Sequence, residues 1–432
     1  MNLPVRWETV VEPRPLLEVL ATDAASAPDD ERFVLIKGAG SQDDGLVGWG
    51  VAARIPVGSG PDRFARAREG IAALASTGSR GPIAFASFTF DEDDDASVMV
   101  VPEVVVMRQG GVTWRITVGP AATDRPAPTV VLPPGEPHEP DEPVEPSQGA
   151  VADRPRYAGS TVRDDHWLEA VASALSAIDA GEYAKVVLAR DLHLWSKRPF
   201  AVPRVLEDLA ARFPSCMTFL VDHLVGASPE LLLRRDGDTI TSRVLAGTAP
   251  RGDTPEEDAA VGSALLTSDK DLREHDLALR SAVAALEPVC ATLTVPDGPS
   301  LVALDNVQHL GSDLTGTLRT PSSADPDGVD THVLSLLARL HPTAAVGGAP
   351  RAEAIAAIRE LEGMPRGRYA APVGWCTPDG DGEFAIALRC AEIRGARARL
   401  FAGAGIVEGS LPEAELTETW LKLRAMTGVL DR

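Results

Sequence analysis

The clearest pattern of apolar and polar positions lies in the second half of the chain. Residues 165–181 place apolar side chains at helical spacing and end at Gly181, a residue type that commonly stops a helix. Residues 184–195 follow as a largely apolar, strand-like run. Further helix-like segments are 205–212, 256–286, 331–340, 351–361 and 412–426, and further strand-like segments are 217–221, 231–235, 239–242, 369–376, 384–393 and 398–406. The chain is therefore predicted to mix helices with many strands.

Short turns indicate how these strands pair. Asp236-Gly237 separates the strand-like segments 231–235 and 239–242, and an Asp-Gly-Asp-Gly sequence occupies 379–382. Tight turns of this kind join antiparallel neighbours. The pattern favours an α+β fold over a doubly wound parallel sheet.

The first third of the chain has a different pattern. Residues 1–132 carry short β-rich stretches such as 33–36 and 98–106, and an acidic run at 91–95 indicates either a solvated hairpin tip or a metal site. Residues 133–146 are too polar and too rich in proline to pack or to join a sheet. We therefore predict an N-terminal α+β portion over 1–132, a linker or surface loop over 133–160, and a C-terminal portion over 161–432.

Composition limits the classes of function. The 432 residues include 41 Lys and Arg against 63 Asp and Glu, a formal net charge of −22, which argues against binding to nucleic acids or anionic membranes. An anionic substrate would need a local positive site. The chain has no apolar run of about 18 residues and its start lacks the layout of a signal peptide, so we expect a cytoplasmic protein. Four widely spaced cysteines are expected to be buried thiols.

Two cationic residues stand out because their surroundings are apolar. Lys185 opens the strand-like run 184–195, where it either reaches the surface or is desolvated; a desolvated neutral amine can act as a base. Arg389, near the end of an apolar run, would hold either a ligand carboxylate or a structural partner. Gly403 and Gly405 in the next strand would allow backbone amides to approach an anion.

Several carboxylates have positions that suit chemistry. Glu230 directly precedes three leucines, so its pKa could be raised for proton donation, although a turn glutamate is also common there. Glu274 lies in the middle of a helix with many charges. Glu415, Glu418 and Lys422 share one helix face, which suits either a magnesium ion or an ordinary surface salt bridge.

Eight segments together resemble, in order, the signature blocks of the chorismate-utilising enzymes, a family that includes anthranilate synthase component I, aminodeoxychorismate synthase, salicylate synthase and isochorismate synthase. The segments are 183–190 (YAKVVLAR), 226–230 (GASPE), 245–252 (LAGTAPRG), 268–275 (SDKDLREH), 340–348 (LHPTAAVGG), 369–375 (YAAPVGW), 403–407 (GAGIV) and 415–419 (ELTET). The resemblance covers about residues 165–428 and weakens in 1–132. It implies an α+β fold in which antiparallel sheets stack face to face with helices outside.

The resemblance also implies a set of site residues. Magnesium would be bound by Glu274 and Glu418, with Glu415 nearby, and would contact the ring carboxylate of chorismate. The substrate carboxylates would be held by Arg389, Lys422 and the amides around Gly403 and Gly405. The ring pocket would be lined by Gly247 and Thr248, with His341 on its opposite side.

Two positions indicate which reaction is expected. Family members that add ammonia carry glutamine at the position of Lys185, whereas members that add water carry lysine, so no glutaminase partner is expected. Ala345 resembles isochorismate synthases rather than salicylate synthases, which go on to eliminate pyruvate. The resemblance therefore implies an isomerase that makes isochorismate, with salicylate synthase as the alternative. Lys185 would deprotonate water and Glu230 would protonate the departing hydroxyl group. The product could feed menaquinone or siderophore biosynthesis.

Overall fold

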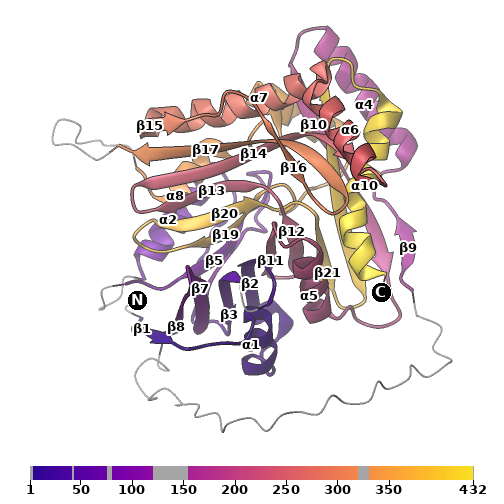
Figure 1. Cartoon of the computed structure of the whole chain (residues 1–432). Helices are drawn as coiled ribbons and strands as arrows, with labels where there is room; N and C mark the ends of the chain where they lie inside the picture. Colours follow the sequence, from indigo (N-terminus) through magenta and orange to yellow (C-terminus); the bar gives the residue numbers. More distant parts are fainter. Residues whose placement is uncertain (1–2, 41–42, 75–79, 120–153, 320–329, 432) are drawn as a thin grey trace.

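The computed structural model describes residues 3–40, 43–74, 80–119, 154–319 and 330–431 (Figure 1). Within these ranges the strands form two sheets, and every pairing between neighbours is antiparallel. The first sheet has the order β1 (Val5–Val10), β8 (Val112–Val118), β7 (Val104–Gln109), β3 (Asp44–Trp49), β2 (Arg32–Lys37), β11 (Met217–Val221), β12 (Leu224–Ser228), β21 (Cys390–Arg394), β22 (Arg397–Val407), β10 (Lys185–Trp195) and β18 (Gly348–Ala349), and β9 (Arg156–Gly159) also pairs with β10. The second sheet has the order β15 (Cys290–Thr294), β17 (Val307–Leu318), β14 (Thr239–Pro250), β13 (Leu231–Asp236), β20 (Gly382–Ile386), β19 (Pro372–Cys376), β5 (Ala84–Ser87), β6 (Val98–Val101) and β4 (Ala53–Arg54), and β16 (Ser300–Ala303) pairs with β17.

The two sheets face each other across the main apolar core. Phe33 of β2 and Phe85 of β5 meet there, with ring centroids 5.4 Å apart, and Phe219 and Phe384 are buried in the same cluster. Burial of such large side chains removes apolar surface from water and stabilises the stack. This arrangement confirms the predicted α+β fold of stacked antiparallel sheets.

Helices cover the outer faces of both sheets (Figure 1). Those that pack mainly on the first sheet are α1 (Leu16–Asp23), α4 (Asp164–Asp179), α5 (Val202–Arg212), α9 (Arg351–Leu361) and α10 (Pro412–Leu430). Those near the second sheet are α2 (Arg63–Ala72), α6 (Pro255–Leu266), α7 (Asp269–Leu286) and α8 (Val333–Leu340). A second apolar cluster, which includes Leu16, Leu206 and Met426, fills the space between the first sheet and helices α1, α5 and α10.

Two predicted elements have to be corrected. The single helix expected over 256–286 is two helices, because the Ser268 side chain accepts a hydrogen bond from the Asp271 amide and begins α7 anew. The single strand expected over 384–393 is divided between β20 in the second sheet and β21 in the first. The chain crosses between the sheets at residues 387–389, where Arg389 has a φ of +49°.

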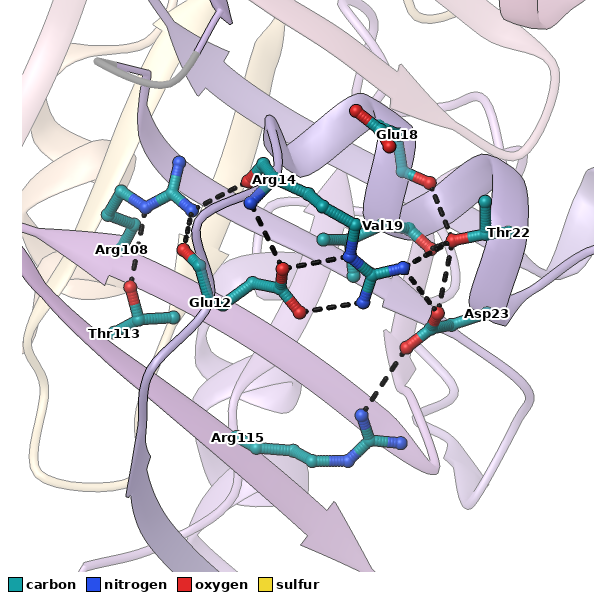
Figure 2. A network of polar contacts seen from close by, with 9 residues as sticks. All are labelled: Glu12, Arg14, Glu18, Val19, Thr22, Asp23, Arg108, Thr113 and Arg115. Carbon is teal, nitrogen blue, oxygen red and sulfur yellow. Dashed lines mark hydrogen bonds and ion pairs between the residues drawn. The ribbon is translucent and has the colours of Figure 1, made fainter. Parts of the chain in front are cut away.

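The N-terminal portion is built into both sheets. Strand β2 pairs with β11, and β5 pairs with β19. A polar network joins α1 to strand β8: Arg14 binds Glu12, Thr22 and Asp23, and Asp23 lies 3.6 Å from Arg115 of β8 (Figure 2). Residues 133–146 of the predicted linker lie outside the described residues, whereas β9 falls in the last part of the segment 133–160.

Other predictions about surface and composition can also be checked. The acidic run 91–95 connects the antiparallel neighbours β5 and β6, and Asp91 and Asp93 pair with Arg359 of α9 at 2.5 and 3.1 Å. All four cysteines are buried free thiols, as predicted. Among the described residues, none of the helices has the length and apolar character needed to cross a membrane.

Candidate active site

A pocket opens where strands of the two sheets approach α7 and α10. Nine of the thirteen predicted site residues line it, namely Glu230, Gly247, Thr248, Glu274, Ala345, Arg389, Gly403, Gly405 and Lys422. Residues distant in the sequence therefore meet at one place. Of the other four, Lys185 and Glu418 are paired with lining residues, and Glu415 and His341 are described below.

Lys185 is completely buried at the start of β10, which excludes the alternative that it reaches the surface. Its Nζ atom lies 3.1 Å from Oε1 of Glu274. Gly405 leaves the space for this pair: a Cβ atom at that position would lie 2.1 Å from Oε1 of Glu274 and 3.1 Å from Cε of Lys185. The lack of a side chain at Gly405 is thus required by the ion pair.

Glu230 follows β12 and is 4% exposed. Burial raises its pKa to about 8, although the nearby cations of Lys185, Lys422 and Arg389 act in the opposite direction. This carboxyl group is therefore largely protonated at neutral pH. The expected direction of its pKa shift is confirmed.

Three lysines neutralise the three predicted metal ligands. Besides the pair of Lys185 with Glu274, Lys270 lies 2.7 Å from Glu415, and Lys422 lies 2.6 Å from Glu418. The pKa of Glu415 is raised by burial and by Glu418. Burial alone would raise the pKa of Glu274, but the lysines lower it.

The charge on these facing helices suits a cation. Helices α7 and α10 and the start of strand β10 bring together four carboxylates and three lysines, namely Asp271, Glu274, Glu415 and Glu418 with Lys185, Lys270 and Lys422. Burial raises the pKa of Asp271, and Glu274 and Glu418 raise it further. Within the described parts of the chain, no three Asp, Glu, His or Cys side chains already converge as a metal site. The donors are all oxygens and carry excess negative charge, which fits a hard cation such as magnesium.

Arg389 combines a special backbone conformation with an open donor. One of its Nη atoms lies 2.9 Å from Nε2 of His309, and its Nε atom is buried without a hydrogen-bond partner among the described residues. Since arginine only donates, Nε2 of His309 must accept, so the proton sits on Nδ1, 3.2 Å from the Gly247 carbonyl oxygen. Burial, Arg389 and Lys422 lower the pKa of His309 well below its ordinary value. A neutral histidine therefore orients Arg389, whose Nε can still bind a ligand.

His341 does not lie where it was predicted. It follows α8, its Nε2 atom is 3.3 Å from the Phe90 carbonyl oxygen, and the rings of Phe64 and Phe90 pack edge-on against it. Burial lowers its pKa to about 3. The pocket histidine is instead His309 on β17, a strand that the sequence pattern did not predict.

The remaining predicted residues define the walls of the pocket. Lys422 donates a hydrogen bond to the Gly403 carbonyl oxygen at 2.8 Å while it pairs with Glu418. The Thr248 hydroxyl group lies 3.2 Å from Nδ1 of His309. Gly247 has a φ of +77° at an irregularity in the pairing of β14 with β17, which a residue with a side chain would adopt only with strain.

The sequence pattern of the family described as "Chorismate binding enzyme" matches residues 6–431. The chain belongs to this family. It is 41% identical over 277 residues to the isochorismate synthase MenF of Bacillus subtilis, a match that covers 63% of this chain and 57% of the relative. It is 42% identical over 267 residues to the isochorismate synthase DhbC of the same organism, covering 59% of this chain and 65% of that protein.

A solved structure supports the fold. The menaquinone-specific isochorismate synthase MenF of Escherichia coli superposes with a TM-score of 0.75, covers 99% of this chain and 95% of its own, and is 24% identical. This likeness confirms the predicted fold, and the family match over residues 6–431 confirms the resemblance to chorismate-utilising enzymes. The matches to the two Bacillus relatives span less than two thirds of the length of those relatives.

Proposed function

We propose that this chain is an isochorismate synthase, which adds water at ring carbon 2 of chorismate and releases the 4-hydroxyl group. The observation that carries the proposal is a completely buried lysine, Lys185, held 3.1 Å from Glu274 beside a pocket that also contains the buried acid Glu230. A base and an acid placed in one buried pocket suit a displacement in which one hydroxyl group enters while another leaves.

Lys185 would act as the base after it has released the proton that it holds in the ion pair with Glu274. Its neutral amine takes a proton from water while the water oxygen forms the new bond to ring carbon 2 and the ring double bonds shift toward carbon 4. The lysine becomes an ammonium ion as this happens. The Glu274 carboxylate, 3.1 Å away, is placed to stabilise that new charge.

Glu230 would act as the acid. With a pKa of about 8 it holds its proton at neutral pH and can give it to the 4-hydroxyl group, which departs as water when the bond to carbon 4 breaks. The resulting carboxylate is stabilised by the nearby cations Lys422 and Arg389, and by Lys185, which has become an ammonium ion in the same reaction. One water enters and one leaves, and transfer of a proton from Lys185 to Glu230 restores the starting state.

The substrate carboxylates would be held by the cations at the pocket wall. The unpartnered Nε atom of Arg389 offers a hydrogen bond that protein groups in the described regions do not use. Lys422 supplies a second positive charge, although it also binds Gly403 and Glu418. Gly247 and Thr248 would border the ring of the substrate.

We also propose magnesium as the cofactor. Glu274 and Glu418 would hold it, with Glu415 close by, and when bound it would offset the negative charge of the substrate. The support for this proposal is the excess of carboxylates over lysines between α7 and α10. Lys185 in place of glutamine supports water rather than ammonia as the nucleophile, so no glutaminase partner is proposed.

A single incubation tests this function. Purified protein with chorismate and magnesium, without ammonia, is expected to give an isochorismate peak on chromatography. Fluorescent salicylate together with free pyruvate would instead support a salicylate synthase, against which Ala345 argues. Chorismate left unchanged, at a protein concentration that gives turnover with a known isochorismate synthase, would contradict the proposal.

A further inference from the structure

One edge of strand β10, which carries Lys185, is paired with other strands along only part of its length. Strand β10 pairs with β18 only at Lys185 and Val186, and with β9 only from His193 onward. Between these two partners the backbone of β10 is hydrogen-bonded by the side chains of Glu362 and Arg366, which follow α9 and form an ion pair with each other. The Val187 carbonyl oxygen accepts a hydrogen bond from Arg366 at 2.7 Å, and the Ala189 amide donates to Glu362 at 2.8 Å.

Arg366, which itself lines the pocket, has all three of its side-chain nitrogen atoms hydrogen-bonded to protein groups. Its Nε atom donates to both carboxylate oxygens of Glu362, one Nη atom donates to the Val346 carbonyl oxygen at 2.8 Å, and the other donates to Val187 and Glu362. The side chains of Arg366 and Glu362 are 3% and 2% exposed. The guanidinium carbon also lies 4.0 Å from the centroid of the Phe90 ring. Every nitrogen of Arg366 is thus already engaged, in contrast to Arg389.

The two backbone oxygens that Arg366 binds belong to the segments that determine the proposed reaction. Val187 lies two residues after Lys185 on the same strand, and Val346 directly follows Ala345. Val187, Ala345 and Val346 all line the pocket. The guanidinium group of Arg366 is rigid and planar. It therefore fixes the distance between the segment of Lys185, the proposed base, and the segment of Ala345, which distinguishes isochorismate from salicylate synthases.

We propose that Glu362 and Arg366 form a positioning pair that holds Lys185 in register with the Ala345 segment. The proposal rests on the proposed function for the role of Lys185. It predicts that loss of the pair slows the chemical step more than it weakens substrate binding, because Arg389 and Lys422, the proposed carboxylate ligands, lie on other elements. Misplacement of a reacting group by about 1 Å can lower a rate by about a hundredfold.

The chain offers a matched control. Arg108 and Asp43 form another buried ion pair, with side chains 7% and 2% exposed. Like Arg366, Arg108 binds a carboxylate and two backbone carbonyl oxygens, those of Glu12 and Arg14, both at 2.8 Å (Figure 2). No member of this group lines the pocket. Substitution of Arg108 should therefore leave an unpaired buried carboxylate as in the Arg366 variant, without any effect on the site.

The experiment compares Arg366→Met and Arg366→Lys with Arg108→Met, using thermal unfolding and steady-state kinetics well below the lowest unfolding midpoint. Both Arg366 variants are expected to lose about thirtyfold or more in kcat with KM within about threefold, because a lysine keeps the charge but cannot bind both carbonyl oxygens. Arg108→Met should keep both constants within about threefold while its unfolding midpoint falls. A raised KM with normal kcat in the Arg366 variants would mean direct substrate binding and would overturn the proposal. A wild-type kcat in Arg366→Lys would also overturn the proposal. The same holds for a loss of kcat in Arg108→Met as large as that in Arg366→Met.

Amide hydrogen exchange separates this inference from the proposed function. In the Arg366 variants the Ala189 amide should exchange about tenfold faster or more, because Glu362 loses the partner that holds it, whereas Arg108→Met should leave that amide protected. This result does not depend on turnover. Failure of the wild-type protein to convert chorismate would contradict the proposed function but not the positioning pair. Unchanged protection of the Ala189 amide in the Arg366 variants would contradict the positioning pair but not the proposed function.

Discussion

Replacing Glu230 with glutamine should stabilise the protein and abolish its turnover. The pKa of this carboxyl group rises from an ordinary value of 4.5 to about 8 because the group is buried. The folded protein therefore binds the proton more tightly than the unfolded chain does. Stability is lost as the pH rises from 4.5 toward 8, and the loss is complete above that range.

The magnitude follows from the pKa shift. At about 1.4 kcal/mol per unit of pKa, the buried carboxyl group costs about 2 kcal/mol at pH 6 and about 5 kcal/mol at pH 9. Glutamine has nearly the same shape and does not ionise, so the free energy of unfolding of Glu230→Gln should exceed that of the wild type by about these amounts. Its kcat should fall about a hundredfold or more, since proton donation by a positioned acid contributes at least that factor.

Denaturant unfolding at pH 6 and pH 9 measures the stability change, and chromatography of the chorismate reaction measures the turnover. Glu169→Gln, at an exposed position of α4, is the control and should change neither quantity appreciably. The stability gained by Glu230→Gln over the wild type should be larger at pH 9 than at pH 6. An equal gain at the two pH values would contradict the raised pKa of Glu230. Retained turnover in that variant would refute the acid role separately.

Three further predictions concern the same pocket. Gly405→Ala should lower kcat about tenfold or more, because the new methyl group would displace Glu274 from Lys185; normal kinetics in a folded variant would contradict the claim that the Lys185–Glu274 pair needs a glycine at this position. His309→Gln, which can still accept from Arg389, should raise KM less than His309→Asn, which is too short to reach it, and equal KM values would contradict the orienting role. Chelation of divalent cations with EDTA should stop turnover and added magnesium should restore it, whereas turnover that persists after dialysis against EDTA would exclude a metal requirement.

The elements that were predicted correctly depend on local patterns. Helix α9 over Arg351–Leu361 and strand β11 over Met217–Val221 match the predicted segments because periodic apolar positions reveal the face that is buried. Lys185 and Glu230 could be singled out for a similar reason, since each charged residue interrupts or borders an apolar run. Both side chains are buried in the structure, whereas their catalytic roles stay a proposal.

What escaped prediction depends on contacts between distant segments. Strand β17, which carries His309, contains Gly311 and Gly316 and has few of the β-branched residues that mark a strand, so its pairing with β14 is not visible locally. The crossing between the sheets at Arg389 requires a positive φ at a residue that seldom adopts one. The hydrogen bonds of Arg366 likewise depend on carbonyl groups from two other segments.

The central claim is that the amine of Lys185 activates water for attack on chorismate. Wild-type protein and Lys185→Gln can be incubated with chorismate and magnesium in water enriched in oxygen-18, and the products analysed by mass spectrometry. Wild-type isochorismate is expected to carry the heavy isotope in its new hydroxyl group, and Lys185→Gln is expected to bind chorismate but to make no isochorismate. Unlabelled wild-type isochorismate, or labelled product from Lys185→Gln at the wild-type rate, would contradict the central claim.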